Sequence, residues 1–283
     1  MQVRALEREL LARLQPLGAE ARPTARLLLE HFTGLDAVAA ALAPEAETAP
    51  ETVREIWQAA AGVLQGRPVQ YLLHEAWFYG RRFKVDGRVL IPRPETEELV
   101  HWLLTEHPDA ERCRLADWCT GSGCIAVTVA LERPSWSCTA MDAFVPVLEV
   151  ARENGAALSA PVRWQQRNLL SDAPQPEETA FYDLITCNPP YVREGERPRM
   201  PERVRAHEPA SALFVPDEDP LRFYRAVAGW GLHALRRKGE IYLEINECLG
   251  TETAQLLQSQ GYAVELRRDM QGKERMIKAI RKA

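Results

Sequence analysis

The chain has 283 residues, of which 46% are hydrophobic and 27% charged, and its net charge is −5, from 35 Lys and Arg against 40 Asp and Glu. This composition is typical of a folded globular protein, and the length fits one large domain plus a small one. Because proteins bind nucleic acids largely by neutralising phosphates, the acidic total argues mildly against direct nucleic-acid binding.

The sequence contains no recognisable targeting signal and no metal-binding motif. No apolar run is long enough to span a bilayer, and residues 1–17 alternate charge with leucine in place of a signal-peptide core. Six cysteines occur without a C-x-x-C pair, and six histidines without an H-E-x-x-H pattern. We therefore expect a cytoplasmic protein with reduced thiols, no protein-bound metal and no membrane association, and we expect a monomer.

The first part of the chain, residues 1–75, is predicted to form a small helical bundle. Four leucines recur at steps of four and three, which places them on one face of a helix: Leu6, Leu10, Leu14 and Leu17. Further helices are predicted over residues 25–32 and 35–42, and from Pro50 to a stop at Gly66. We expect four or five helices in all.

Residues 76–92 are predicted to form a β-hairpin that links two domains. Aromatic and β-branched residues lie on both sides of turn formers here, and Asp86-Gly87 is a hairpin-type turn signal. A helix is then expected to begin between Pro92 and Pro94, with Glu95 and Glu97 in its first turn. Negative charge is favoured at that end of a helix, so we assign these glutamates a structural role.

The remaining region, residues 93–283, alternates strands and helices. Five strands are expected over residues 113–118, 136–141, 162–167, 181–187 and 240–245, and four helices over residues 123–131, 145–157, 221–235 and 249–259. Two final strands, over residues 262–267 and 276–280, lack an intervening helix, so at least one should be antiparallel. The fold class is therefore α/β, with a mostly parallel, Rossmann-like, seven-stranded sheet covered on both faces.

A glycine loop at residues 119–123 follows the first of these strands. Gly121 and Gly123 allow close approach of a ligand, and Asp142, at the end of the next strand, is placed to bind the ribose of a nucleoside. The layout serves nicotinamide dinucleotides and S-adenosylmethionine alike, and a plain tight turn would also explain it. A dinucleotide loop needs G-x-G-x-x-G for its pyrophosphate, whereas Cys119 occupies the first glycine position, which favours the phosphate-free methyl donor.

The segment Asn188-Pro189-Pro190-Tyr191 follows an apolar strand, at the edge where open α/β sheets bind ligands. The prolines offer carbonyls without donors, and Asn188 adds a side-chain acceptor, so together they can hold both hydrogens of an NH2 group. Tyr191 offers a flat wall for a planar amide or base and electron density near a sulfonium. A rigid turn is the alternative, but the glycine loop and Asp142 favour methyl transfer to nitrogen, which depends mainly on alignment.

Nearly the whole chain resembles the release factor glutamine methyltransferases, the PrmC/HemK family. The resemblance rests on the glycine loop, N-P-P-Y and further segments: G-R-P-V-Q-Y at 66–71, L-I-P-R-P-E-T-E at 90–97, E-P at 208–209 and G-K-E-R at 272–275. It implies an S-adenosylmethionine-dependent enzyme whose substrate is the glutamine of the Gly-Gly-Gln loop in class I peptide chain release factors. The bundle would position this protein substrate, and residues 93–283 would bind the cofactor and catalyse the transfer.

The resemblance also assigns the site. The methionine end of S-adenosylmethionine is expected at the glycine loop: Cys119, Thr120, Gly121, Ser122 and Gly123. Asp142 would bind the ribose, and Asn168 and Leu169 would flank the adenine. Substrate binding and catalysis fall to the N-P-P-Y segment: Asn188 would touch both cofactor and glutamine, with Pro189, Pro190 and Tyr191 completing the grip. This chain departs from the family at Cys119, usually glycine, and at Asn168, often aspartate.

Other functions remain open from the sequence. A ribosomal-protein glutamine methyltransferase or a DNA or RNA exocyclic-amine methyltransferase would share the N-P-P-Y chemistry, and a nicotinamide or flavin oxidoreductase would share the sheet. The acidic total weakens the nucleic-acid version, and the missing third glycine weakens the oxidoreductase.

Overall fold

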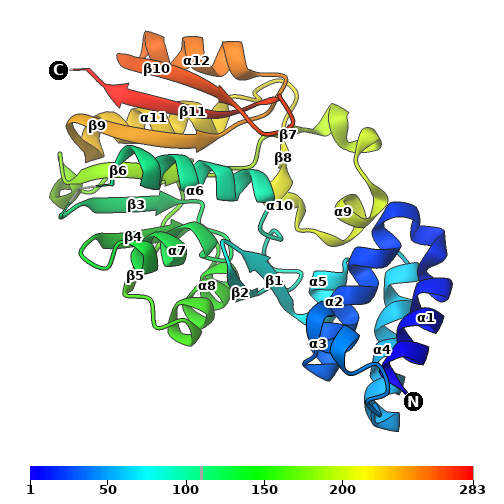
Figure 1. The fold of residues 1–283 in the computed structure, drawn as a ribbon. Helices are drawn as coiled ribbons and strands as arrows, with labels where there is room; N and C mark the ends of the chain where they lie inside the picture. Colours follow the sequence, from blue (N-terminus) through cyan, green and yellow to red (C-terminus); the bar gives the residue numbers. More distant parts are fainter. Residues whose placement is uncertain (109–110, 283) are drawn as a thin grey trace. The chain divides into compact units, whose positions relative to one another are not determined.

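The computed structural model of the chain describes residues 1–108 and 111–282 (Figure 1). The chain folds into two compact units. The first comprises Met1–Glu75 and Pro201–His207, and the second comprises Ala76–Met200 and Glu208–Ala283.

The first unit is a helical bundle with its own apolar core. Its helices are α1 (Val3–Leu14), α2 (Ala21–Thr33), α3 (Ala37–Leu42), α4 (Pro50–Leu64), α5 (Val69–Leu73) and α9 (Glu202–His207), with a 3₁₀ turn at Gln15–Glu20. Leu6, Leu10 and Leu14 are completely buried, which confirms the predicted leucine stripe over α1. Leu17 lies beyond α1 in the 3₁₀ turn and is only partly buried. Pro50 begins α4, as expected for proline in a first helical turn.

A two-stranded hairpin opens the second unit, formed by β1 (Glu75–Phe78) and β2 (Arg81–Lys84). The prediction that Asp86-Gly87 forms its turn is wrong, because β2 has ended before Asp86. The turn is Tyr79-Gly80 instead, where both residues have positive φ, 49° and 74°. Two consecutive positive φ values match the twist of a tight hairpin. The strained Tyr79 is held by its amide, which donates to Glu97 Oε1 at 2.8 Å.

A seven-stranded sheet forms the centre of the second unit, in the order β10-β11-β9-β6-β3-β4-β5. The strands are β3 (Arg114–Trp118), β4 (Ser137–Asp142), β5 (Val162–Gln166), β6 (Tyr182–Cys187), β9 (Leu235–Glu244), β10 (Tyr262–Arg268) and β11 (Glu274–Arg281). β11 runs antiparallel to both of its neighbours, and the other described pairs of this sheet are parallel. The expected mostly parallel sheet with a reversed strand near its end is therefore confirmed.

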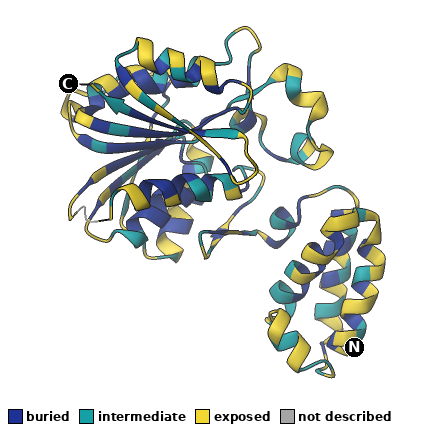
Figure 2. Cartoon of the chain, turned by 45° about the horizontal axis from the view of Figure 1, so that its top comes forward, coloured by how far each residue is buried: buried dark blue, intermediate teal, exposed yellow. Residues whose placement is uncertain are grey.

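Helices cover both faces of this sheet (Figure 1). One apolar cluster joins the sheet to α6 (Pro94–Glu106) and α7 (Cys124–Glu132), and α8 (Val145–Ala157) packs beside α7. The other cluster lies under α11 (Arg222–Ala234) and α12 (Gly250–Ser259). Alternate residues enter opposite clusters, as period-2 strands require: Leu115 faces one and Ala116 the other. Figure 2 shows the resulting buried strands between partly exposed helices.

The chain reverses its direction of travel across the sheet between β3 and β6. After β3 it moves outward to β4 and β5, and it then returns to β6 on the other side of β3. Such a switch point leaves a crevice at the carboxyl ends of the strands, which is where open α/β sheets bind ligands.

Residues 192–215 form short elements that the sequence pattern does not predict. They are β7 (Val192–Arg193), a 3₁₀ turn (Glu194–Arg199), α9, α10 (Ala210–Leu213) and β8 (Phe214–Val215), with β7 and β8 paired in parallel. A further 3₁₀ turn spans Pro176–Glu178. Among the described residues, no helix combines the length and hydropathy needed to cross a membrane.

Candidate functional site

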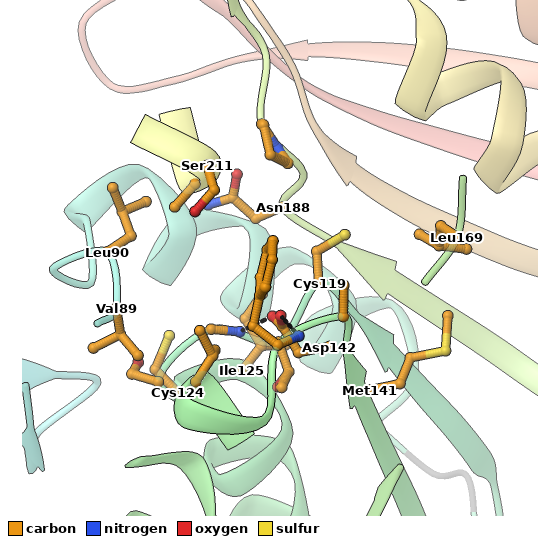
Figure 3. A pocket seen from close by; sticks show the side chains of 18 of the residues that line it. Val89, Leu90, Cys119, Cys124, Ile125, Met141, Asp142, Leu169, Asn188 and Ser211 are labelled. Atoms are coloured by element: carbon orange, nitrogen blue, oxygen red, sulfur yellow. Dashed lines mark hydrogen bonds between the residues drawn. The ribbon is translucent and has the colours of Figure 1, made fainter. Parts of the chain in front are cut away.

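A cavity of about 200 Å³ lies at the carboxyl ends of the parallel strands, in the second unit. Residues that follow β3, β4, β5 and β6 line it, together with the segments before α6 and around α10. Figure 3 shows Cys119, Asp142 and Asn188 around it, with Leu90 and Ser211 toward one side and Met141 and Leu169 toward the other. The switch point of the sheet therefore coincides with a cavity.

The glycine loop enters this pocket with three left-handed residues. Cys119, Gly121 and Gly123 have φ of 59°, 57° and 81°. At Gly123 a side chain would also be crowded, because an added Cβ would lie 3.0 Å from the ring of Trp164. The amide of Thr120 donates to the carbonyl of Met141 at 3.0 Å, which ties the loop to β4. The loop is therefore fixed at the end of the sheet, with its backbone facing the cavity.

A fully buried carboxyl group, Asp117, supports the loop from below. It accepts hydrogen bonds from Thr120 Oγ1 at 2.5 Å and from Thr186 Oγ1 at 2.9 Å. These bonds connect the ends of β3 and β6 beneath the cavity. Burial raises the pKa of Asp117 to about 7 in spite of these hydrogen bonds.

Asp142 presents a carboxylate to the pocket from the end of β4. Its Oδ2 accepts the amide of Gly121 at 3.1 Å and its Oδ1 accepts the amide of Phe144 at 3.2 Å. Burial raises the pKa of Asp142 above its ordinary value. Each carboxylate oxygen has a second lone pair, so the group can still accept hydrogen bonds from a pair of vicinal hydroxyls.

Beyond Asp142, the pocket is lined by groups suited to a flat apolar ligand. Leu169 and Met141 are buried in the wall, while Phe144 also lines the pocket and is 51% exposed. Asn168 directs its Oδ1 to the amide of Leu170 at 2.9 Å, which fixes its side chain in a local turn.

At the opposite side of the pocket, Asn188 belongs to a chain of polar side chains. Its Nδ2 donates to Thr96 Oγ1 at 3.1 Å, and Thr96 Oγ1 donates to Glu244 Oε2 at 2.5 Å. The hydroxyl of Tyr191 donates to Glu244 Oε1 at 2.8 Å. Glu244 is 1% exposed, and burial raises its pKa above the ordinary value although both hydroxyls and nearby Arg275 oppose the shift.

The pocket brings together most of the site residues expected from the sequence. Nine of them line it: Cys119, Thr120, Gly121, Ser122, Asp142, Asn168, Leu169, Asn188 and Pro190. Gly123, Pro189 and Tyr191 are not among the lining residues. Tyr191 packs against the apolar core and turns its hydroxyl to Glu244, so its ring supports the segment from beneath.

Two residues of this network, Thr96 and Glu244, were not singled out from the sequence as site residues. They lie 148 positions apart, and only the fold joins them. The sequence signals for them are weak: Thr96 lies within the I-P-R-P-E-T-E segment, and Glu244 is a carboxylate at the end of β9, directly after the apolar residues 241–243.

Three arginines line the pocket, and each has a carboxylate partner. The pairs are Arg88 with Asp86 at 2.7 Å, Arg93 with Glu208 at 2.5 Å, and Arg167 with Glu178 at 3.3 Å. Because these guanidinium groups are already engaged, the pocket suits a nucleoside ligand without phosphates better than a dinucleotide.

Comparisons with known proteins match two parts of the chain to known domain families. Residues 6–73 match the PrmC N-terminal domain, and residues 97–204 match the methyltransferase small domain. Release factor glutamine methyltransferase from Bacteroides thetaiotaomicron is 43% identical over 218 residues, which is 77% of each chain. The enzyme of that name from Deinococcus radiodurans is 34% identical over 282 residues, which is 99% of each chain.

Among solved structures, a methyltransferase from Pyrococcus furiosus resembles the fold. The TM-score is 0.54 at 14% sequence identity, and the match covers 80% of this chain and 99% of the other. This likeness supports the α/β fold of the second unit.

Proposed function

This chain belongs to the release factor glutamine methyltransferases, and we propose that it methylates the side-chain amide nitrogen (N5) of the glutamine in the Gly-Gly-Gln motif of class I peptide chain release factors, with S-adenosylmethionine as methyl donor. The donor becomes S-adenosylhomocysteine. The main support for this function is the position of Asn188, which lines the pocket and whose Nδ2 already donates a hydrogen bond to Thr96. Its Oδ1 therefore serves as the acceptor for an incoming amide N–H.

The residues around the pocket fit S-adenosylmethionine. Asp142 would accept the ribose hydroxyls, Leu169 and Asn168 would flank the adenine, and the glycine loop would lie along the methionine end. The paired arginines leave no guanidinium of the lining dedicated to a phosphate, which the donor lacks. When bound, the donor supplies a methyl carbon on a sulfonium; the N–C bond forms as the C–S bond breaks, and the amide then loses a proton to water.

The chain's own contribution is alignment. Asn188 Oδ1 and the carbonyl of Pro189 would each accept one N–H of the substrate amide, which directs the nitrogen toward the methyl group. Well-oriented reacting groups can lower a barrier by roughly 7–11 kcal/mol. Tyr191 and Glu244 would hold the segment in place from the core side.

Residues 1–75 would help to position the protein substrate, residues 76–92 would act as the linker, and residues 93–283 would hold the cofactor and the reacting amide. We further propose that the enzyme acts as a cytoplasmic monomer without direct nucleic-acid contact. The net charge of −5 supports a protein substrate over a nucleic acid.

The direct test is incubation of the protein with methyl-labelled S-adenosylmethionine and full-length release factors. Label should enter the wild-type factor and should not enter a factor whose motif is changed to Gly-Gly-Ala. Label in the altered factor would contradict the proposed substrate site, and label in ribosomal protein or nucleic acid alone would favour those substrates.

Asn188→Ala should lower the turnover number by at least about 100-fold, because orientation of the amide is lost. Binding of S-adenosylhomocysteine and the melting temperature should change little, since the loop and Asp142 are untouched. Radiometric turnover and calorimetric titration measure the two effects. Near-normal turnover in this variant would remove Asn188 from the mechanism.

A further inference from the structure

We propose that Thr96 is a positioning residue that, together with Glu244, sets which end of the Asn188 amide faces the reacting group. Thr96 lies in the first turn of α6, Glu244 ends β9 and Asn188 follows β6, so three separate elements meet here. The inference rests on the proposed function, because it explains why Asn188 can accept a hydrogen bond from the substrate amide.

The single proton on each hydroxyl group determines the direction of the hydrogen bonds between Glu244, Thr96 and Asn188. A hydroxyl carries one proton, and the Thr96 hydroxyl donates it to Glu244 Oε2 at 2.5 Å. The other carboxylate oxygen already accepts the hydroxyl of Tyr191 at 2.8 Å. Thr96 Oγ1 therefore faces Asn188 with a lone pair, and only the NH2 end of the amide can donate to it, at 3.1 Å.

Burial makes this arrangement costly to change. Thr96 is 2% and Glu244 1% exposed, so water does not readily replace a lost partner. Burial raises the pKa of Glu244, while the two hydroxyl donors and the neighbouring charge of Arg275 oppose that shift. In its ionised form the carboxylate only accepts, and both hydroxyls donate to it in the structure, which fixes the polarity of the chain as far as Asn188.

The orientation of the Asn188 amide decides whether it can bond the substrate amide. With Nδ2 on Thr96, Asn188 presents Oδ1 to the pocket as an acceptor. A flipped amide would present NH2 to the substrate NH2, and two donors cannot bond each other. Thr96 never touches the substrate amide in this scheme; it acts through Asn188.

Thr96→Val tests the idea, because valine keeps the shape and removes the hydroxyl. Thr96→Ser is the conservative variant that restores the hydroxyl, and Thr105→Val on the same helix removes an exposed hydroxyl that bonds only within α6. Two quantities would be measured in the full-length protein: hydrogen exchange of the Asn188 side-chain NH2 by NMR with ¹⁵N-labelled asparagine, and steady-state methylation of the release factor.

We expect Thr96→Val to speed exchange of the Asn188 NH2 protons and to lower kcat by roughly 10- to 100-fold, the range that small misplacement costs, with little change in KM. Thr96→Ser should recover most of kcat, and Thr105→Val should match the wild type in both measurements. Unchanged exchange in Thr96→Val would overturn the proposal whatever the activity. A kcat in Thr96→Ser as low as that in Thr96→Val would also overturn the proposal. The loss of turnover would then follow the shape of the side chain and not its hydroxyl.

If the wild-type protein shows the expected slow exchange but methylates no release factor, the proposed function fails while the amide orientation stands.

Discussion

Cys119 places a side chain where the backbone is left-handed, with φ of 59°. Such a conformation costs an L-residue about 1–2 kcal/mol relative to its preferred regions, whereas glycine adopts it freely. We therefore expect Cys119→Gly to raise the free energy of unfolding by up to about 1 kcal/mol, because glycine's greater unfolded-state entropy and the lost packing of the thiol offset part of the relief. Urea unfolding would measure the change.

Gly121→Ala is the matched control for this prediction. Gly121 has nearly the same φ, 57°, and an added Cβ there would meet no atom within 4 Å. It should therefore lower stability by about 1 kcal/mol through the backbone alone. A stabilising Gly121→Ala or a destabilising Cys119→Gly would show that backbone strain does not dominate in this loop.

The buried carboxyl group of Asp117 should make stability depend on pH. Its pKa is raised to about 7 by burial, compared with the ordinary 3.8 of the exposed, unfolded chain. The folded state therefore binds a proton more tightly, so this contribution is fully present below pH 4 and is lost as the pH rises through about 7. At about 1.4 kcal/mol per pKa unit, the loss is at most roughly 4 kcal/mol.

Asp117→Asn removes this titration while keeping the shape of the side chain. The difference in free energy of unfolding between wild type and variant should change in favour of the variant between pH 4 and pH 8, measured by urea unfolding at several pH values. A difference that stays constant over this range would mean that Asp117 keeps the same proton occupancy in the folded and unfolded chain.

At the scale of elements, periodicity predicted most helices and strands of the second unit. The helix expected over residues 145–157 is α8, Val145–Ala157, and the strand expected over residues 181–187 is β6, Tyr182–Cys187. These segments carry long, regular apolar patterns, and local propensity agrees with burial in each. The same patterns place the glycine loop, Asp142 and Asn188 at one edge of the sheet, which explains why most of the predicted site residues line the pocket.

Features that depend on distant contacts could not be predicted in this way. The hairpin turn falls at Tyr79-Gly80 because Glu97, on another element, holds the strained Tyr79 amide. The bond between Thr96 and Glu244 joins residues 148 positions apart. Residues 192–215 lack a sustained period, so their short elements are set by tertiary contacts rather than by propensity.

Two segments that line the pocket are held together by a single buried carboxylate. Glu208, whose side chain is 1% exposed, accepts the amide of Ile91 at 3.2 Å and Arg93 Nη2 at 2.5 Å. It thereby joins the segment before α6, which lines the cavity, to the start of α10, whose Ser211 and Ala212 line the cavity as well. The E-P pair at residues 208–209 therefore has a structural explanation.

Glu208→Ala should lower the free energy of unfolding by about 2–3 kcal/mol, somewhat less than for a fully buried pair because Arg93 is 30% exposed. It should also weaken S-adenosylhomocysteine binding, because the wall of the pocket loosens. Glu194→Ala is the control: it breaks an exposed pair with Arg197, which should cost no more than about 1 kcal/mol. Urea unfolding and calorimetric titration measure both effects, and equal losses in the two variants would contradict the role of Glu208.

At the scale of the whole molecule, the two units have separate apolar cores. The bundle core contains Leu6, Leu10, Leu28 and Ile56, all completely buried within the first unit. The core of the second unit lies on the two faces of the sheet. Every residue that lines the pocket belongs to the second unit. A ligand of this pocket therefore stabilises the second unit directly. It stabilises the bundle only if the two units unfold in one cooperative transition.

Differential scanning calorimetry with S-adenosylhomocysteine tests this separation. A ligand at 100 times its Kd adds about 2.7 kcal/mol to the stability of the part that binds it. We expect one component of the transition to move upward and the other to stay in place, and NADH to move neither, since the arginines of the lining are already paired. Leu10→Ala, which empties part of the bundle core, should lower only the component that the ligand leaves unmoved. A single transition that shifts as a whole with both the ligand and Leu10→Ala would show instead that the two cores unfold as one cooperative unit.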